Sequence, residues 1–141
     1  MTNTKEKKLV IYTDGGARGN PGPAASGVVI FNDQKKMIGE YSKFLGETTN
    51  NQAEYRAVLL ALEKALELEG TEIVLYSDSE LIVNQLNRKY KVKNKELSTI
   101  FVKIWNIAQK FDSVSYHHVP REKNKLADAQ VNECLDQYLD S

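Results

Sequence analysis

Two apolar runs that each end in an aspartate constrain the fold more than any other feature of this chain. Residues 9–13 precede Asp14, and residues 73–77 precede Asp78. Runs of this length and composition predict buried strands. If the two strands are adjacent and parallel, they lie about 4.8 Å apart, and both carboxylates reach the sheet edge where open α/β proteins bind ligands. The alternative is structural: Asp14 would begin a turn, and Asp78 would lie in a capping box formed by Ser77 and Glu80.

The remaining pattern predicts a mixed α/β sheet of five strands with flanking helices. A loop is expected over 15–23, which holds four glycines and two prolines. The strand after each helical crossover should run parallel to the first strand, and a hairpin should supply an antiparallel edge. The expected strands are 9–14, 27–32, 37–45, 73–77 and 114–119, and the expected helices are 49–69, 79–86, 96–111 and 124–139. The first of these helices should begin with a Thr49-x-x-Gln52 capping box and end at Gly70.

The length and composition predict one domain over residues 1–141, with residues 1–8 as a disordered tail. No apolar run approaches the roughly 20 residues that span a bilayer, and the N-terminus lacks the apolar region of a secretory signal. We therefore expect a cytoplasmic protein without membrane contact. The one cysteine, Cys134, offers no disulfide and no thiolate zinc site. The net charge of zero gives no sign of nucleic-acid binding, so such a function must depend on local residues.

Two further acids lie on faces that should be buried. On the helix expected over 49–69, Glu54 lies in the stripe of Val58, Ala61, Leu62 and Ala65. Asp128 is similarly aligned with Val131, Leu135, Tyr138 and Leu139 on the last helix. Buried charges are costly unless they are paired. Each acid therefore either pairs with an arginine or lysine elsewhere in the chain or belongs to a site.

Four converging carboxylates would repel one another unless a divalent cation neutralised them. Hard oxygen ligands suit Mg²⁺, with Mn²⁺ as a substitute, whereas zinc favours histidine or cysteine. The expected chemistry is phosphoryl transfer with two ions per site when substrate is bound, about 3.5 to 4 Å apart.

Four segments carry a resemblance to a known family. In order and spacing, and across residues 9–139, the chain resembles type 1 ribonuclease H in 12–23 (YTDGGARGNPGP), 48–54 (TTNNQAE), 77–79 (SDS) and 121–128 (REKNKLAD). The resemblance implies the ribonuclease H-like fold and an endonuclease that hydrolyses the RNA strand of RNA/DNA hybrids. It also implies a metal site made by Asp14, Glu54, Asp78 and Asp128.

The resemblance further implies contacts with the minor groove of the hybrid. Gly15 and Asn20 would lie near RNA 2′-hydroxyls, with Gly16 in the same glycine-rich loop. Thr49 would lie near a DNA phosphate, and Asn50 and Asn51 would also meet the groove. Such roles are chemically reasonable, because glycine permits close backbone approach and 2′-hydroxyls distinguish RNA from DNA. The alternative is that this loop is an ordinary turn.

The chain departs from the family pattern in three respects. Glu80 replaces a glutamine that many members have two residues after the third acid. The long basic insertion of some bacterial members is absent, which leaves only the basic stretch 89–95 (KYKVKNK). We expect no additional hybrid-binding domain, and in these respects the chain resembles the short form found in archaea and some bacteria. We expect Lys89, Lys91 and Lys93 to contact phosphates; the alternative is a solvated loop.

Two residues compete for an assisting role near Asp128. His118 lies at the offset where many members carry a catalytic-loop histidine, but Pro120 should restrict its movement. Arg121 lies on the loop beside Asp128 and can bind a phosphate with two hydrogen bonds. We expect Arg121 to assist with the scissile phosphate or product and His118 to be secondary. Cys134 and Trp105 are expected to be packing residues.

Other functions remain open on the sequence alone. A nuclease of the same superfamily could act on double-stranded RNA or a transposition intermediate. A catalytically inactive module could bind hybrid, although all four acids are present. We expect a monomer that acts on RNA/DNA hybrid.

Overall fold

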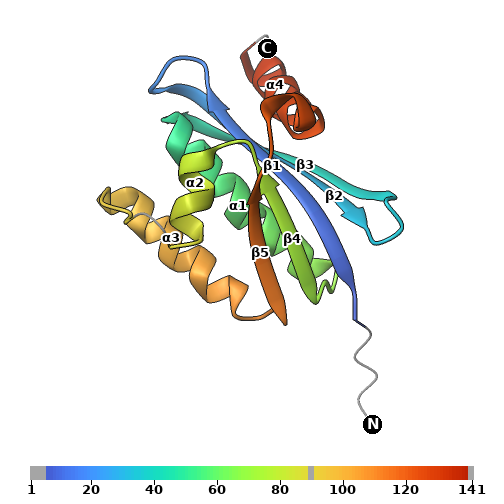
Figure 1. Cartoon of the computed structure of the whole chain (residues 1–141). Helices are drawn as coiled ribbons and strands as arrows, with labels where there is room; N and C mark the ends of the chain where they lie inside the picture. Colours follow the sequence, from blue (N-terminus) through green and yellow to red (C-terminus); the bar gives the residue numbers. More distant parts are fainter. Residues whose placement is uncertain (1–5, 89–90, 140–141) are drawn as a thin grey trace.

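The computed structural model describes residues 6–88 and 91–139, and it contains a five-stranded sheet with helices on both faces (Figure 1). The strand order is β3-β2-β1-β4-β5. The strands are β1 (Lys8–Ala17), β2 (Gly22–Asn32), β3 (Met37–Thr48), β4 (Glu72–Ser77) and β5 (Ser113–His118). The α-helices are α1 (Asn50–Glu67), α2 (Glu80–Leu86), α3 (Lys95–Ala108) and α4 (Lys125–Leu139).

The pairing of the strands confirms the expected mixed sheet. β1 is parallel to β4, and β4 is parallel to β5, whereas β1–β2 and β2–β3 are antiparallel. Thr13 and Ser77 form the last pair of the β1–β4 ladder. Asp14 and Asp78 each follow one of these paired residues, so they lie at the same sheet edge, as the sequence predicts.

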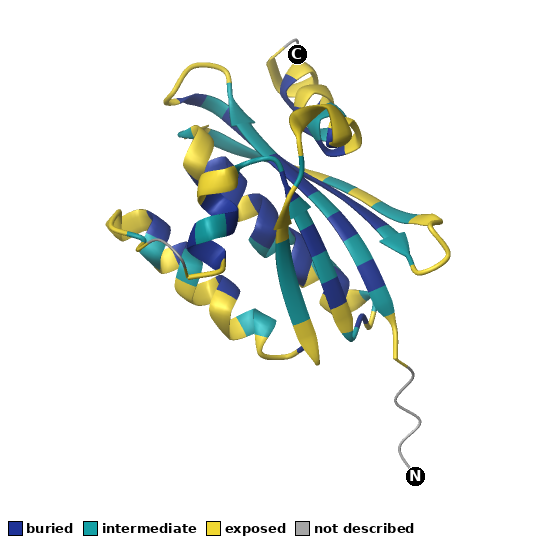
Figure 2. Ribbon diagram, viewed as in Figure 1, coloured by how far each residue is buried: buried dark blue, intermediate teal, exposed yellow. Residues whose placement is uncertain are grey.

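Helices α1, α2 and α3 cover one face of the sheet, and α4 crosses the other (Figure 1). On the first face, alternate residues of β1 and β4 pack against α1 and α3 and form the main core (Figure 2). Burying one such large apolar side chain contributes about 1.5–3 kcal/mol. The fully buried residues of the main core include Leu9, Ile11, Val58, Leu62, Ile73 and Leu75. Under α4 lies a smaller cluster of Ala25, Val131, Cys134 and Leu135.

The loop expected over 15–23 is mostly strand, which corrects the sequence prediction. β1 continues to Ala17, and Gly15 pairs with Ser26 of β2. Gly15 is required for packing, because a Cβ there would lie 2.2 Å from the backbone carbon of Ala53. The sequence pattern could not distinguish this close approach from a turn. A positive φ of 98° occurs only farther along, at Gly19.

Three further boundaries differ from expectation. β1 begins at Lys8, and the backbone N–H of Lys7 donates to Thr71 Oγ1 at 2.7 Å. The disordered tail predicted over 1–8 therefore does not include these two residues. Residues 1–5 lie outside the described part of the chain. α3 ends at Ala108 rather than 111. After α1, the left-handed residue is Glu69, with φ of 61°, rather than Gly70. Gly70 instead packs tightly, since a Cβ there would lie 2.6 Å from Leu9 Cδ1.

Thr49 caps α1 as predicted, because its side chain accepts a hydrogen bond from the Gln52 N–H at 3.2 Å. Ser79, rather than Ser77, caps α2. The capping box proposed as the structural alternative for Asp78 is therefore absent. In the described ranges, no helix is long and apolar enough to cross a membrane.

Candidate active site

Four acids from different elements meet just beyond the last paired residues of β1 and β4. Asp14 lies on β1, Glu54 on α1, Asp78 directly after β4, and Asp128 in the first turn of α4. Carboxylate oxygens of Asp14, Glu54 and Asp78 all lie within 4.8 Å of one another. All four acids line one cavity of about 540 Å³, which we call the carboxylate cleft. Its other lining residues are Gly15, Gly16, Ala17, Arg18, Asn50, Ser79, Arg121, Val131, Asn132 and Leu135.

Local packing brings α1 against β1 at this point. The close approach of Gly15 to the Ala53 backbone leaves no room for any side chain between them. Ser26 Oγ donates to Ala53 O at 2.7 Å from the neighbouring strand. Glu54 is consequently held against Asp14, although its helix face is otherwise apolar, as the periodicity predicts.

A buried asparagine brings α4 to the same place. Asn124, directly before α4, is 1% exposed, and its Nδ2 donates to Thr13 O at 2.9 Å. Asp128 lies one turn into α4, where its Oδ2 accepts from Asn132 Nδ2 at 3.2 Å. Asp128 is half-buried rather than buried, and Tyr138 and Leu139, predicted on the same buried face, are 56% and 44% exposed.

Burial and mutual repulsion raise the pKa values of the inner acids. Burial raises the pKa of Asp14 to about 8, and the charge of Asp78 and a hydrogen bond and charge from Asp128 add to the rise. Burial also raises the pKa of Glu54 well above its ordinary value, reinforced by the charges of Asp14 and Asp78. The Arg121 guanidinium opposes this rise only in part. The protein alone therefore does not neutralise the cluster.

The donor set fits a divalent metal ion. Glu54 Oε1 is buried without a hydrogen-bond partner among the described residues. Within residues 6–88 and 91–139, the two ion pairs join Arg18 to Asp136 and Lys64 to Glu67, so neither includes an acid of the cleft. This contradicts the alternative in which Glu54 and Asp128 pair with cations. Carboxylate oxygens without histidine or cysteine suit a hard ion such as Mg²⁺ or Mn²⁺.

Of the residues predicted to contact the groove, the structure places Gly15, Gly16 and Asn50 in the lining of the carboxylate cleft. Asn50 Oδ1 accepts from the Ala17 N–H at 2.7 Å, and Asn20 Oδ1 accepts from the Asn50 N–H at 3.0 Å. Thr49 uses its oxygen to cap α1, and Asn51 is exposed in the first turn of that helix. The asparagine oxygens thus tie the β1–β2 turn to α1. Their amide nitrogens make no hydrogen bond within the described residues.

Of the two competing assisting residues, the structure brings Arg121 to the cleft and leaves His118 outside its lining. Arg121 begins a short 3₁₀ helix, Arg121–Lys123, and is exposed. His118 is the exposed last residue of β5.

The described part of the basic stretch lies between α2 and α3, away from the cleft lining. Lys91 and Lys93 are exposed there. Lys89, the third lysine predicted to contact phosphate, lies outside the described residues.

Sequence reasoning missed several residues that shape the cleft. Asn124 was assigned only to the start of a helix, although a polar residue four positions before Asp128 could have drawn attention. Arg18 lines the cleft and its Nη2 lies 2.7 Å from Asp136 Oδ1 on α4. Such long-range pairs leave no periodic signal in the sequence.

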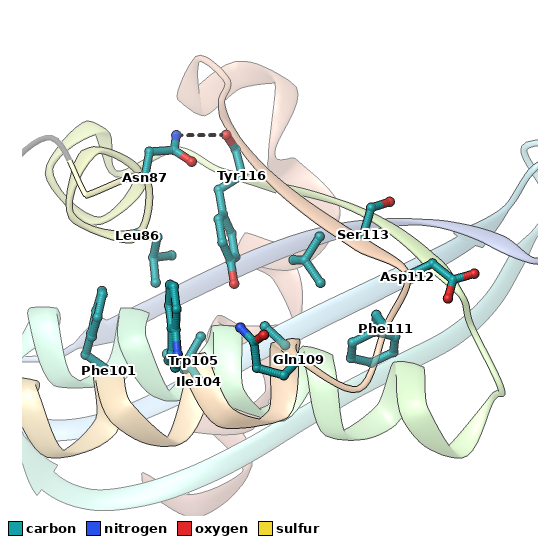
Figure 3. A pocket seen from close by; sticks show the side chains of 12 residues that line it. Leu86, Asn87, Phe101, Ile104, Trp105, Gln109, Phe111, Asp112, Ser113 and Tyr116 are labelled. Atoms are coloured by element: carbon teal, nitrogen blue, oxygen red, sulfur yellow. Dashed lines mark hydrogen bonds between the residues drawn. The ribbon is translucent and has the colours of Figure 1, made fainter.

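A second cavity, of about 330 Å³, lies between α3 and β5 (Figure 3). It is lined by aromatic side chains including Phe101 and Trp105 and carries Asp112 as its single acid. It therefore lacks the acid cluster of the carboxylate cleft. Trp105 is 44% exposed and lies 4.9 Å from the Arg88 guanidinium, so it is not the packing residue that we expected. Cys134 is buried, as predicted.

Comparison with known proteins gives consistent similarities. The profile of the family described as reverse transcriptase-like matches residues 12–134. The bifunctional protein Rv2228c of Mycobacterium tuberculosis is 39% identical over 130 residues, which cover 92% of this chain and 36% of that protein. The chain thus spans about a third of the length of the first curated relatives that it matches.

Solved structures align over nearly their full length. The structure of RNase H1 from the halophilic archaeon Halobacterium salinarum has a TM-score of 0.90 and 39% identity, covering 92% of this chain and 98% of that one. LC11-RNase H1 in complex with RNA/DNA hybrid has a TM-score of 0.88 and 47% identity, covering 93% and 99%. The ribonuclease H fold expected from the sequence is confirmed.

Proposed function

The chain belongs to the ribonuclease H family, and on that premise we propose that it is an endonuclease that hydrolyses the RNA strand of RNA/DNA hybrids. The observation that carries the proposal is the convergence of three carboxylates within 4.8 Å, with Asp128 beside them. This cluster includes a buried, unpartnered oxygen of Glu54. A metal-dependent phosphodiester hydrolase uses an uncompensated acidic site of this kind to hold its divalent cations.

Asp14, Glu54, Asp78 and Asp128 would hold the ions, Mg²⁺ by preference and Mn²⁺ as a substitute. When bound, two ions supply an activated water and stabilise the charge on the leaving oxygen. The negative charge of the carboxylates would also affect the binding of the negatively charged substrate. Because bound cations relieve the repulsion among the acids, we expect metal to strengthen the binding of the substrate phosphates.

We propose that Asn20 and Asn50, beside the cleft, allow the protein to distinguish RNA from DNA. Asn50 lines the cleft and Asn20 binds the Asn50 backbone; the side-chain oxygens of both accept from backbone N–H groups, which leaves their amide nitrogens to donate. N–H groups held in this way can donate hydrogen bonds to a 2′-hydroxyl, which RNA has and DNA lacks. Gly15 and Gly16 leave the cleft floor without side chains, and Thr49 and Asn51 extend this contact surface along the start of α1.

Arg121 would bind the scissile phosphate or the product, a role supported by its place in the lining of the cleft and by the permanent charge of a guanidinium group. Lys91 and Lys93, together with Lys89, would contact phosphates farther along the duplex. His118 would have a secondary role, consistent with its place outside the cleft lining.

We further propose that residues 1–141 form one domain that acts as a monomer in the cytoplasm. One main core joins all five strands to three helices, which supports a single domain. The exposed large apolar side chains are spread over β3 and the four α-helices, which supports a monomer. Cys134 is free and buried, which suits a reducing compartment.

The test compares duplexes of one sequence: RNA/DNA hybrid, double-stranded RNA and double-stranded DNA, each incubated with Mg²⁺ or Mn²⁺. We expect cleavage of the RNA strand in the hybrid and intact DNA. Faster cleavage of double-stranded RNA would assign the alternative substrate. Tight hybrid binding without cleavage in either metal would assign a binding module instead.

A further inference from the structure

A buried polar pair joins the helix that carries Glu54 to the helix that precedes the basic stretch. Tyr55 of α1 is fully buried, and its hydroxyl donates a hydrogen bond to Gln85 Oε1 of α2. Burial raises the pKa of this hydroxyl, which therefore stays protonated and acts as the donor. Gln85 is itself 8% exposed, and its Nε2 donates to Lys91 O at 3.4 Å. The pair is thus connected by a hydrogen bond to the backbone of the basic stretch.

The described part of the basic stretch is held from its inner side. Ser98 Oγ donates to Val92 O at 3.2 Å, and the Val92 side chain packs against the main core. Asn94 Oδ1 then accepts from the backbone N–H groups that begin α3. Lys91 and Lys93 remain exposed on either side of Val92. The backbone is fixed while both ammonium groups face solvent.

One turn of α1 connects this arrangement to the carboxylate cleft. Glu54 points into the cleft, and Tyr55, the next residue, points to Gln85. Gln52 supplies a second link, because its Nε2 donates to Glu96 Oε2 on α3 at 3.3 Å. The metal-binding face and the anchor of the basic stretch are therefore adjacent positions of the same rigid helix.

We infer that Tyr55 and Gln85 are positioning residues that hold Lys91 and Lys93 at a fixed place relative to the carboxylates, so that one hybrid duplex meets both. This inference rests on the proposed function. Neither residue can touch substrate, since both are buried. Their contribution is to keep the lysine-bearing backbone in its binding conformation before substrate arrives, which avoids the ordering cost at binding.

A buried pair could instead serve stability alone, and a double variant separates the two roles. Tyr55→Phe or Gln85→Met leaves one buried polar group without its partner, so each single variant should unfold more easily. Tyr55→Phe/Gln85→Met removes both groups, and near-normal stability should return. The hydrogen bond to Lys91 O is still absent in the double variant. Hybrid affinity should therefore remain weakened after stability has recovered.

The experiment measures hybrid affinity in EDTA by anisotropy, and kcat at saturating hybrid with Mg²⁺. For the double variant we expect binding weaker by roughly three- to tenfold, with kcat within about twofold of wild type. The slope of log affinity against log salt should become shallower, by up to about 0.9 per lost phosphate contact. The matched control is Asn87→Ala, which removes a hydrogen bond from the end of α2 to Tyr116 O (Figure 3) and should leave affinity and slope unchanged.

The inference is overturned if the double variant binds hybrid with the affinity and salt slope of wild type. It is also overturned if Lys91→Ala/Lys93→Ala binds hybrid normally while cleavage continues, because no contact then needs positioning; the proposed function would survive that result. A wild-type protein that cleaves no hybrid would instead reject the proposed function, and the inference with it.

Discussion

Asp14 and Asp78 each stand one residue beyond a paired position of two adjacent parallel strands, because Thr13 pairs with Ser77. The pairing places two acids side by side, and the charge of Asp78 helps raise the pKa of Asp14 to about 8. The backbone register itself thus creates the repulsion that a divalent cation relieves.

Metal-free protein should lose stability as the pH rises. The folded-state pKa of Asp14, about 8, lies above the unfolded value of about 3.9, so the native state binds more protons between these values. Stability is therefore highest below about pH 4 with respect to this group and falls as pH rises through about 8. Thermal unfolding in EDTA should show this decline, and Asp14→Asn should flatten it. A wild-type midpoint that rises steadily between pH 5 and 8 would contradict the assignment.

Gly15→Ala should be strongly destabilising. Its new Cβ would lie 2.2 Å from the backbone carbon of Ala53, where no flexible side chain can move away. Overpacking of this kind costs typically about 1–3 kcal/mol and occasionally more. Gly16→Ala is the matched control, because its Cβ would lie 3.7 Å from Val131 Cγ1. Denaturant unfolding of the two variants should differ clearly; equal stabilities would show that α1 does not pack on β1 as described.

The basic stretch should contribute electrostatic affinity. If Lys89, Lys91 and Lys93 contact phosphates, changing all three to alanine should reduce the salt slope of hybrid binding by roughly 0.9 per contact. The change should act on duplexes of any sequence, since phosphate contacts carry no base information. An unaltered slope in the triple variant would show that the stretch is a solvated loop.

Arg121→Ala should lower turnover more than His118→Ala. Arg121 lines the carboxylate cleft and His118 does not. A residue that assists the reaction contributes about 10² to 10⁴ in rate when it transfers a proton, so a catalytic histidine would be readily detected. At saturating Mg²⁺, the rate profile should show no step near pH 6.5, the ordinary histidine value. Such a step, present in wild type and lost in His118→Ala, would reverse the assignment.

Sequence periodicity was sufficient where one residue's environment follows from its own element. The apolar runs that Asp14 and Asp78 follow place these two acids together, and the helical stripe places Glu54, as the structure has them. Periodicity failed where the role of a residue depends on contact with a distant segment. Gly15 fits the backbone of α1, and Asn124 binds Thr13 from 111 positions away.

The same limit explains the missed anchor of the basic stretch. Tyr55 and Gln85 look like ordinary helix residues, because their hydrogen bond joins two helices whose packing no local pattern specifies. Glu69 is a similar case. Gly70 is the expected helix terminator, but it packs against Leu9, and Glu69 adopts the left-handed conformation instead. Long-range packing decides both cases.

The most direct test of the four-carboxylate site uses a hybrid with an end-labelled RNA strand, incubated with wild type or Asp14→Asn in Mg²⁺ or EDTA. We expect internal RNA fragments only with wild type in Mg²⁺. Asp14→Asn, which removes one charge and little volume, should remain folded by circular dichroism and produce no fragments. Fragments from wild type in EDTA, or near-normal turnover by Asp14→Asn at saturating Mg²⁺, would contradict the metal-dependent site.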